Sequence, residues 1–184
     1  MLRPLTLAIA LLVLPALSAS GRDWNKDQRL EAVAEQGDAE AAFILALLHA
    51  NGDGVPQDYK TAAKWYALAA EQGHPSAQYN LGELHRSGRG VLQDYKAAVR
   101  LYRLAAEQGV AHAHNNLGFM YENGYGVLQD FVRAHMRYNI AASVGGVNFA
   151  PGNRDGLAKR MTPAQIAEAQ DLARECVAKN YKGC

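Results

Sequence analysis

The sequence predicts an all-α protein, a right-handed α-solenoid of helical hairpins that repeat every 36 residues. The tetrapeptide Ala-Glu-Gln-Gly recurs at 34–37, 70–73 and 106–109. Two further blocks keep the same interval: Gly-x-Gly-Val begins at 52, 88 and 124, and Gln-Asp-Tyr or Gln-Asp-Phe begins at 57, 93 and 129. So many matching columns without an insertion indicate an array of one supersecondary unit.

The first segment of the chain, residues 1–20, has the pattern of a secretory signal. Arg3 gives a positive start, a mostly apolar run follows over 5–14, and Pro15 precedes small residues. This order predicts cleavage near residues 18–20 and a periplasmic or secreted protein with no membrane span after processing. An uncleaved anchor is the alternative, but the polar end at 18–21 interrupts the apolar run early.

Each repeat unit is expected to form two helices. In the second unit, Ala77, Leu81 and Leu84 share one helical stripe, and Gly88 suits a helix C-terminus. Asp94 is then a natural N-cap for the second helix. One hairpin cannot bury both of its apolar stripes, so neighbouring units must stack. We therefore divide the mature chain into an N-terminal capping helix (21–36), three repeats (37–72, 73–108 and 109–144) and a degenerate C-terminal cap (145–184).

The two ends are expected to be atypical, because one face of a terminal unit meets water. Residues 24–36 predict a lone helix. Pro151 and Gly152 indicate a loop before a short helix over 153–160. Thr162, followed by Pro163 and Gln165, then predicts an N-cap with a capping box and a helix from 163 to about 179.

The repeat columns resemble the Sel1-like repeat, a relative of the tetratricopeptide repeat. In the second unit the resemblance rests on Leu81-Gly82, the Gly-Arg-Gly-Val block at 88–91, Asp94 and Tyr102. His49 and His85 stand where the family has Tyr, and Ala46 stands where it has Gly. The resemblance implies an α-solenoid that acts as a scaffold for protein contacts.

The two cysteines, Cys176 and Cys184, are expected to form one disulfide. They lie eight residues apart, the interval that separates Ala69 from Ala77 where one unit passes to the next. Cysteine-rich members of the resembled family carry bridges at this spacing, and export would favour oxidation over two free thiols. The short loop predicts a modest stabilisation of about 2–3 kcal/mol. A redox pair is the other interpretation, although Cys-x-x-Cys is absent.

Composition and motifs exclude several classes of function. Beyond residue 20 the chain has 18 basic and 18 acidic residues, so it lacks the charge of a general nucleic-acid binder. The Gly-x-Gly blocks belong to repeat columns and lack the strand that a phosphate loop needs. His112 and His114 diverge on a helix, and His-Glu-x-x-His is absent, so no metal and no cofactor are expected.

A hydrolase is the second hypothesis that the sequence leaves open. Some cysteine-rich Sel1-like proteins are associated with penicillin binding or β-lactam hydrolysis, which suggests cell-wall or β-lactam ligands by resemblance alone. No serine of the mature chain begins Ser-x-x-Lys, and Gly-x-Ser-x-Gly is missing. No catalytic residue is therefore assigned, and we predict that the protein is not an enzyme.

The candidate binding surface lies on the first helix of each unit, at positions three, six, ten and thirteen after the leading Gly. By analogy with tetratricopeptide arrays, this face lines a concave groove. Its members are Glu40, Phe43, Leu47 and Ala50, then Ser76, Tyr79, Glu83 and Arg86, then His112, Asn115, Phe119 and Glu122. The assigned partner-binding residues are Phe43, Leu47, Tyr79, Glu83, Arg86, Asn115, Phe119 and Glu122.

The composition of this face supports a scaffold. Phe43, Leu47, Tyr79 and Phe119 offer apolar anchors, and aromatic residues beside Arg86 are typical of interface hot spots. The alternative is that these aromatics are ordinary packing between neighbouring first helices. We predict a monomeric, exported adaptor or regulator that binds another protein or an extended peptide.

Overall fold

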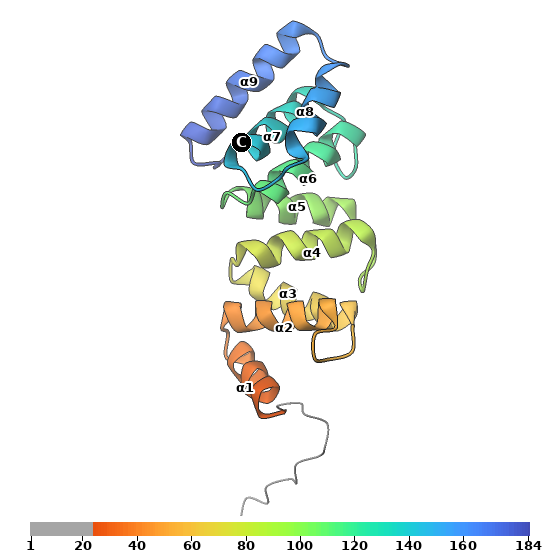
Figure 1. Cartoon of the computed structure of the whole chain (residues 1–184), viewed down its shortest axis with the longest axis vertical. Helices are drawn as coiled ribbons and strands as arrows, with labels where there is room; N and C mark the ends of the chain where they lie inside the picture. Colours follow the sequence, from red (N-terminus) through yellow and green to blue (C-terminus); the bar gives the residue numbers. More distant parts are fainter. Residues whose placement is uncertain (1–23) are drawn as a thin grey trace, which may run out of the picture.

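The computed structural model describes residues 24–184, which are helical and contain no strand; the expected signal lies outside the described residues. The helices are α1 (Trp24–Glu35), α2 (Ala39–Asn51), α3 (Tyr59–Glu71), α4 (Pro75–Ser87), α5 (Tyr95–Ala106), α6 (Ala111–Asn123), α7 (Phe131–Val144), α8 (Ala150–Ala158) and α9 (Pro163–Ala178). They follow one another along the long axis of an elongated stack, from α1 at one end to α9 at the other (Figure 1). The predicted all-α solenoid is confirmed.

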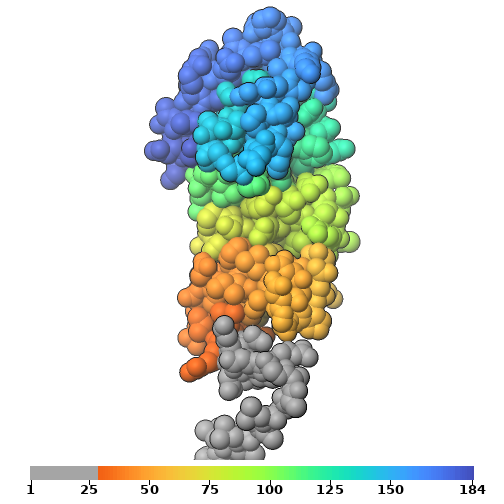
Figure 2. Space-filling view, viewed as in Figure 1, coloured from red at the N-terminus to blue at the C-terminus, as the bar shows by residue number. Residues whose placement is uncertain are grey.

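Three helical hairpins, α2–α3, α4–α5 and α6–α7, form the body of the stack, and each packs on the next. In the space-filling view successive segments form bands along the length of the molecule (Figure 2). The apolar core runs through the stack as linked clusters rather than one centre, with Leu45, Leu81 and Leu101 in one cluster and Leu117 and Met120 in the next. This arrangement is the nearest-neighbour packing expected of a solenoid.

The repeated polar residues cap the helices as their spacing predicts. The carboxylates of Asp58, Asp94 and Asp130 accept hydrogen bonds from backbone N–H groups in the first turn of α3, α5 and α7 at 2.9–3.0 Å. Gly52 and Gly88 end α2 and α4 in the left-handed conformation, which glycine adopts at the lowest cost.

The Gly-x-Gly loop also joins neighbouring repeats. A Cβ added at Gly90 would lie 2.3 Å from the backbone of Tyr59, at the start of the preceding repeat's second helix, and Gly126 meets Tyr95 in the same way. Gly54 occupies the same column in the first repeat and has open space around it. The second glycine of the loop thus allows close backbone contact with the preceding repeat in the second and third repeats, and the first repeat has no such contact at Gly54.

A tyrosine in each second helix lies across the first helix of its own repeat. Tyr66, Tyr102 and Tyr138 are buried. A Cβ at Gly82 would lie 2.7 Å from the ring of Tyr102, and a Cβ at Gly118 would lie equally close to Tyr138. In the second and third repeats the glycine of Leu-Gly therefore makes room for the tyrosine ring, whereas the first repeat has Ala46 at this position beside the buried Tyr66.

The C-terminal cap consists of α8, α9 and a tail that turns back. Thr162 caps α9 with both hydrogen bonds of a capping box, as the sequence predicts. The prediction of a loop at Pro151 and Gly152 is wrong: both belong to α8, whose first turn tolerates proline because the N–H there needs no helical partner. Cys176 and Cys184 form a disulfide with a Cα–Cα distance of 5.6 Å. Across the described residues, no helix is long and apolar enough to cross a bilayer.

Candidate functional site

The predicted binding residues lie along α2, α4 and α6, and we call this surface the first-helix face. Phe43, Leu47 and Tyr79 are half-buried, and Phe119 is 39% exposed. Their inner parts pack on the core while the outer parts meet solvent, so they are neither pure core nor free surface. These side chains therefore pack in part against the core, and their use as a binding groove stays a prediction.

Aromatic rings form two contact chains across neighbouring helices of this face. Phe43 of α2 stacks on His74, the N-cap of α4, with ring centroids 4.4 Å apart. The ring centroid of Tyr79 of α4 lies 5.9 Å from that of His112 of α6, and the centroid of His112 lies 6.4 Å from that of Phe149 at the start of α8. The aromatic surface thus continues beyond the three repeats onto the C-terminal cap, where Phe149 is 54% exposed.

Glu83 is the polar centre of the first-helix face. Arg86 donates two hydrogen bonds to its carboxylate, at 2.7 and 3.1 Å. Asn116 of α6 donates another at 2.6 Å, and the hydroxyl of Tyr102 of α5 donates as well. Burial disfavours the charged form, but the hydrogen bonds from Arg86 and Tyr102 outweigh it and hold the pKa of Glu83 below its ordinary value.

Glu122 occupies a similar arrangement one repeat later. It accepts hydrogen bonds from the hydroxyl of Tyr138 at 2.8 Å and from Arg160, beyond the end of α8, at 2.9 Å. The Arg160–Glu122 ion pair ties the C-terminal cap to the third repeat. Glu83 and Glu122 therefore each fix a tyrosine tip and an arginine on this face.

Asn115 is buried, whereas a residue that lines a binding groove should be accessible. It is only 4% exposed, and its side-chain oxygen accepts a hydrogen bond from Asn153 of α8 at 2.9 Å. The short helix α8 covers it, because the chain after α7 returns over the end of α6. The remaining seven predicted residues, Phe43, Leu47, Tyr79, Glu83, Arg86, Phe119 and Glu122, keep at least part of their side chains accessible.

Tyr102, Tyr138 and Asn116 contribute to this face although the prediction did not assign them to it. Tyrosine recurs at the repeat interval, at 66, 102 and 138, and in the second and third repeats the same repeat also carries Leu-Gly; this joint recurrence is the sequence signal for a ring that lies over the first helix. Phe149 lies outside the repeat columns, so repeat spacing carried no signal for it.

The polar groups of the first-helix face are largely bonded to one another. The oxygens of Glu83 and Glu122 are already bonded to arginine, asparagine or tyrosine. Among the side chains that the structure describes, those of residues 29–184, no group of three or more His, Cys, Asp or Glu is placed to hold a metal ion. The face offers apolar and aromatic contacts between fixed ion pairs.

The geometry defines the class of protein, a solenoid of stacked helical hairpins with buried tyrosines over glycines. The sequence matches the Sel1 repeat at 39–74, 75–110 and 111–145, more than half of the chain. The chain therefore belongs to the Sel1 repeat family, whose members are generally non-catalytic scaffolds for protein–protein interaction. No curated protein matches the sequence.

Three solved structures are similar to this one. A protective antigen of uropathogenic Escherichia coli with an SLR fold has a TM-score of 0.77 and 31% identity, over 84% of this chain and 34% of that one. A Sel1 repeat protein from Oxalobacter formigenes has a TM-score of 0.63 and 36% identity, over 72% and 98% of the two chains. Cysteine rich protein B of Helicobacter pylori has a TM-score of 0.54 and 18% identity, over 68% and 95%, and supports the fold alone. The chain spans about a third of the length of the Escherichia coli antigen.

Proposed function

We propose that this protein is an exported, non-enzymatic scaffold that binds another protein or an extended peptide through its first-helix face. The observation that carries the proposal is the row of partly exposed aromatic and apolar side chains on α2, α4 and α6, formed by Phe43, Leu47, Tyr79 and Phe119. A stretched segment could place alternate side chains against these anchors. Large, rigid anchors bury much area at a small cost in side-chain entropy.

The fixed ion pairs between the anchors support recognition of a polar backbone. Arg86 and Glu83 hold one another, as do Arg160 and Glu122, so neither pair must be ordered when a partner binds. Preorganised polar groups reduce the entropic cost of association. Only three repeats are present, so the contact area is small and micromolar affinity is expected.

Export is the part of the proposal that rests on chemistry outside the first-helix face. The disulfide Cys176–Cys184 is compatible with an oxidising compartment such as a periplasm or the extracellular space. The apolar pattern of residues 1–20 is consistent with a signal that directs the chain there.

A photo-crosslinking amino acid at Phe119 tests the binding face. We expect it to capture a defined partner from the cell-envelope fraction, identified by mass spectrometry. The matched control carries the same group at Leu104, which is 43% exposed on the second helix α5. We expect no such capture there.

The double variant Tyr79→Ala/Phe119→Ala completes the test. It should lose capture by a purified, immobilised partner while keeping its helical circular dichroism. Equal capture by the wild type and the folded variant, or equal crosslinking from Phe119 and Leu104, would contradict the proposal. A variant that unfolds would mark Tyr79 as core, and Phe119→Ala alone then provides the decisive comparison.

A further inference from the structure

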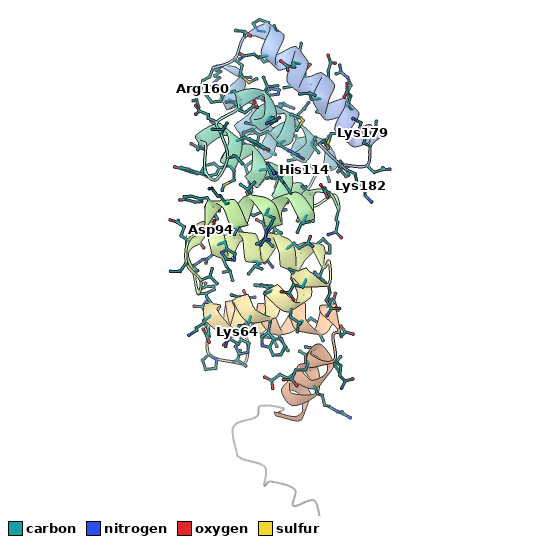
Figure 3. All side chains as sticks on the ribbon, turned by 180° about the vertical axis from the view of Figure 1, so that it is seen from behind. Lys64, Asp94, His114, Arg160, Lys179 and Lys182 are labelled. Carbon is teal, nitrogen blue, oxygen red and sulfur yellow. A yellow bond between two sulfur atoms is a disulfide. The ribbon has the colours of Figure 1, made fainter. Side chains whose placement is uncertain are left out.

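The described part of the array begins with half a repeat. α1 corresponds to a second helix, because the Ala-Glu-Gln-Gly block at 34–37 ends it as the same block ends α3 and α5. The second helices α3, α5 and α7 each pack against the first helix of their own repeat. Among the described residues no first helix precedes α1, and in Figure 3 it is the outermost helix at its end of the stack, beyond α3 with its labelled Lys64. One side of α1 therefore lacks the helix that covers the other second helices.

The column of Val33 shows what such a helix covers. Its equivalents in the three complete repeats, Ala69, Ala105 and Ala141, are fully buried, whereas Val33 is 43% exposed. Leu30 stands in the column of the tyrosines that lie across the first helix of their own repeat. Those tyrosines are buried, and Leu30 is only half-buried. Two apolar positions of α1 are thus uncovered where every complete repeat covers them.

Ile44 of α2 faces the same place. Its equivalent in the third repeat, Asn116, donates a hydrogen bond to Glu83 on the first helix of the preceding repeat. The second repeat also has an asparagine in this column, Asn80. Ile44 is apolar instead and 37% exposed. The first repeat therefore presents an apolar side chain where the others present an amide to a preceding first helix.

Leu30, Val33 and Ile44 together form a surface that we call the open end. Exposed apolar residues that are scattered singly are ordinary in proteins, and terminal repeats are usually polar on their outer side. The open end differs because its three members all belong to columns that meet one first helix in the complete repeats. It continues the interface that joins the helices of each hairpin, so the fold itself shows that an α-helix fits there.

The helix that covers the open end must come from another molecule. α2 and the loop after it take residues 39–58, whereas cleavage near residues 18–20 would leave only a few residues before α1. This step rests on the export in the proposed function. A second copy of the chain offers no free first helix, because α2, α4 and α6 are each packed on their own second helices.

We propose that the open end binds an amphipathic α-helix of another protein, which completes the first unit of the array. Apolar residues three and four positions apart on that helix pack on Leu30, Val33 and Ile44, as in other helix-in-groove contacts. The first helices of this chain have Ala46, Gly82 and Gly118 where the tyrosines cross them, so a small residue is expected at that point of the partner helix. The open end shares no residue with the predicted binding set of the first-helix face, so either proposal can fail alone.

A peptide of residues 74–88, which includes the first helix of the second repeat, serves as the probe. It is titrated into isotope-labelled protein that begins at residue 21, and a scrambled peptide of the same composition is the control. We expect the methyl signals of Val33 and Ile44 to shift and saturate with the probe alone. The ring signals of Phe119 on the first-helix face should stay in place, which separates this contact from the scaffold site.

The double variant Val33→Gln/Ile44→Gln tests the residues. Both side chains are partly exposed, so the variant should keep its helical circular dichroism. We expect it to bind the probe at least about tenfold more weakly, because two apolar contacts are lost. The control Leu104→Gln changes an equally exposed side chain on α5 and should bind as the wild type does. Equal affinity in the double variant and the wild type would overturn the proposal.

A fusion that places a second copy of residues 73–94 before residue 23 supplies the helix within the chain, in the register of the repeat. We expect a higher thermal midpoint and no remaining binding of the probe, because a tethered helix pays less entropy than a free peptide. No gain in the fusion and no binding by the wild type would overturn the proposal. A dimer that Val33→Gln/Ile44→Gln dissociates, measured by sedimentation, would overturn it in favour of a second copy. Loss of probe binding in the chain that keeps residues 1–20 would overturn it in favour of that segment.

Discussion

Glu83 on the first-helix face and Arg137 of α7 make an informative pair. Each stands in a repeat column that is apolar in the other repeats: Glu83 aligns with Leu47 and Phe119, and Arg137 with Trp65 and Leu101. Glu83 accepts hydrogen bonds from Arg86 of its own helix and from Tyr102 of α5 and Asn116 of α6. Arg137 donates a hydrogen bond to an oxygen of Cys184, the last residue of the sequence, and lies 3.3 Å from Nδ1 of His114, while its Nε has no hydrogen-bond partner among residues 29–184.

The difference shows that the repeats of one chain can be compared with one another. The residues at equivalent positions show what the fold accepts there, and a charged residue at a position that is apolar in the other repeats must be explained by its surroundings. Where the surroundings satisfy the charge, as at Glu83, the replacement stabilises a local network. Where they satisfy it only in part, as at Arg137, whose Nε has no partner among residues 29–184, more of the cost of burying the charge remains.

The largest effect is expected for Glu83→Leu. The substitution restores the residue of the first repeat but leaves Arg86, Asn116 and the hydroxyl of Tyr102 without their acceptor. We expect a loss of about 3 kcal/mol in the free energy of unfolding, because partners of a removed charge stay desolvated. Urea denaturation followed by circular dichroism measures it.

The matched control is Glu71→Leu, at an exposed position at the end of α3. It should change the stability by less than about 0.5 kcal/mol. Similar losses in the two variants would show that the Glu83 network contributes nothing special to the fold.

Gly82→Ala should disturb the same network through Tyr102 and lower the free energy of unfolding by about 2 kcal/mol. The new methyl group would lie 2.7 Å from the ring of Tyr102, so the ring must move away from Glu83. Overpacking of this kind costs about 1–3 kcal/mol. The higher helix propensity of alanine offsets less than about 1 kcal/mol of that loss. Thermal unfolding of Gly156→Ala provides the contrast.

Gly156 lies within α8, where an added Cβ meets nothing within 4 Å. Alanine there should stabilise the protein by about 0.5–1 kcal/mol. If Gly82→Ala were also stabilising, the tyrosine–glycine contact could not be the reason for the Leu-Gly column.

Much of the fold could be predicted from the sequence, because the same capping and packing residues recur in three repeats. The Asp caps at 58, 94 and 130, the capping box at Thr162 and the pairing of Cys176 with Cys184 all follow from local chemistry and spacing. These features depend on residues that are close in sequence, so no knowledge of the overall path was needed.

The candidate site could be predicted only in outline. Helical spacing placed seven of the eight residues on the accessible first-helix face, but Asn115 is covered by α8, which follows no repeat column. The partners of Glu83, Tyr102 and Asn116, lie 19 and 33 residues away on other helices. Their convergence depends on how helices rotate and pack, which a single sequence does not specify.

A smaller loss is expected for Arg137→Leu, about 1 kcal/mol in the free energy of unfolding. The substitution removes a buried guanidinium whose Nε is unpaired, which favours folding, but it also takes the donor away from the terminal oxygen of Cys184. Removing one member of a buried charge pair is destabilising, whereas replacing both members is often stabilising. Urea denaturation measures the change, and a gain in stability would show that the Cys184 oxygen does not depend on Arg137.

The smallest effect concerns pH, and it distinguishes the two regions once more. His114 is fully buried beside Arg137 and the ring of Tyr181, and burial, aided by the Arg137 charge, lowers its pKa from 6.5 to about 3. The unfolded chain therefore takes up a proton below pH 6.5 that the folded protein refuses, so stability falls as the pH falls. Between pH 6.5 and 5.5 the loss should be about 1 kcal/mol.

His114→Gln restores the residue of the second repeat, Gln78, and should remove that part of the pH dependence. His135 is also buried with a lowered pKa, so a residual slope should remain. Glu83 contributes nothing in this range, because its depressed pKa makes its stabilisation decline only below about pH 4.5. Urea unfolding at pH 7.5, 6.5 and 5.5 therefore reports on the buried histidines and not on Glu83, and an unchanged slope in His114→Gln would show that this histidine can be protonated in the folded protein.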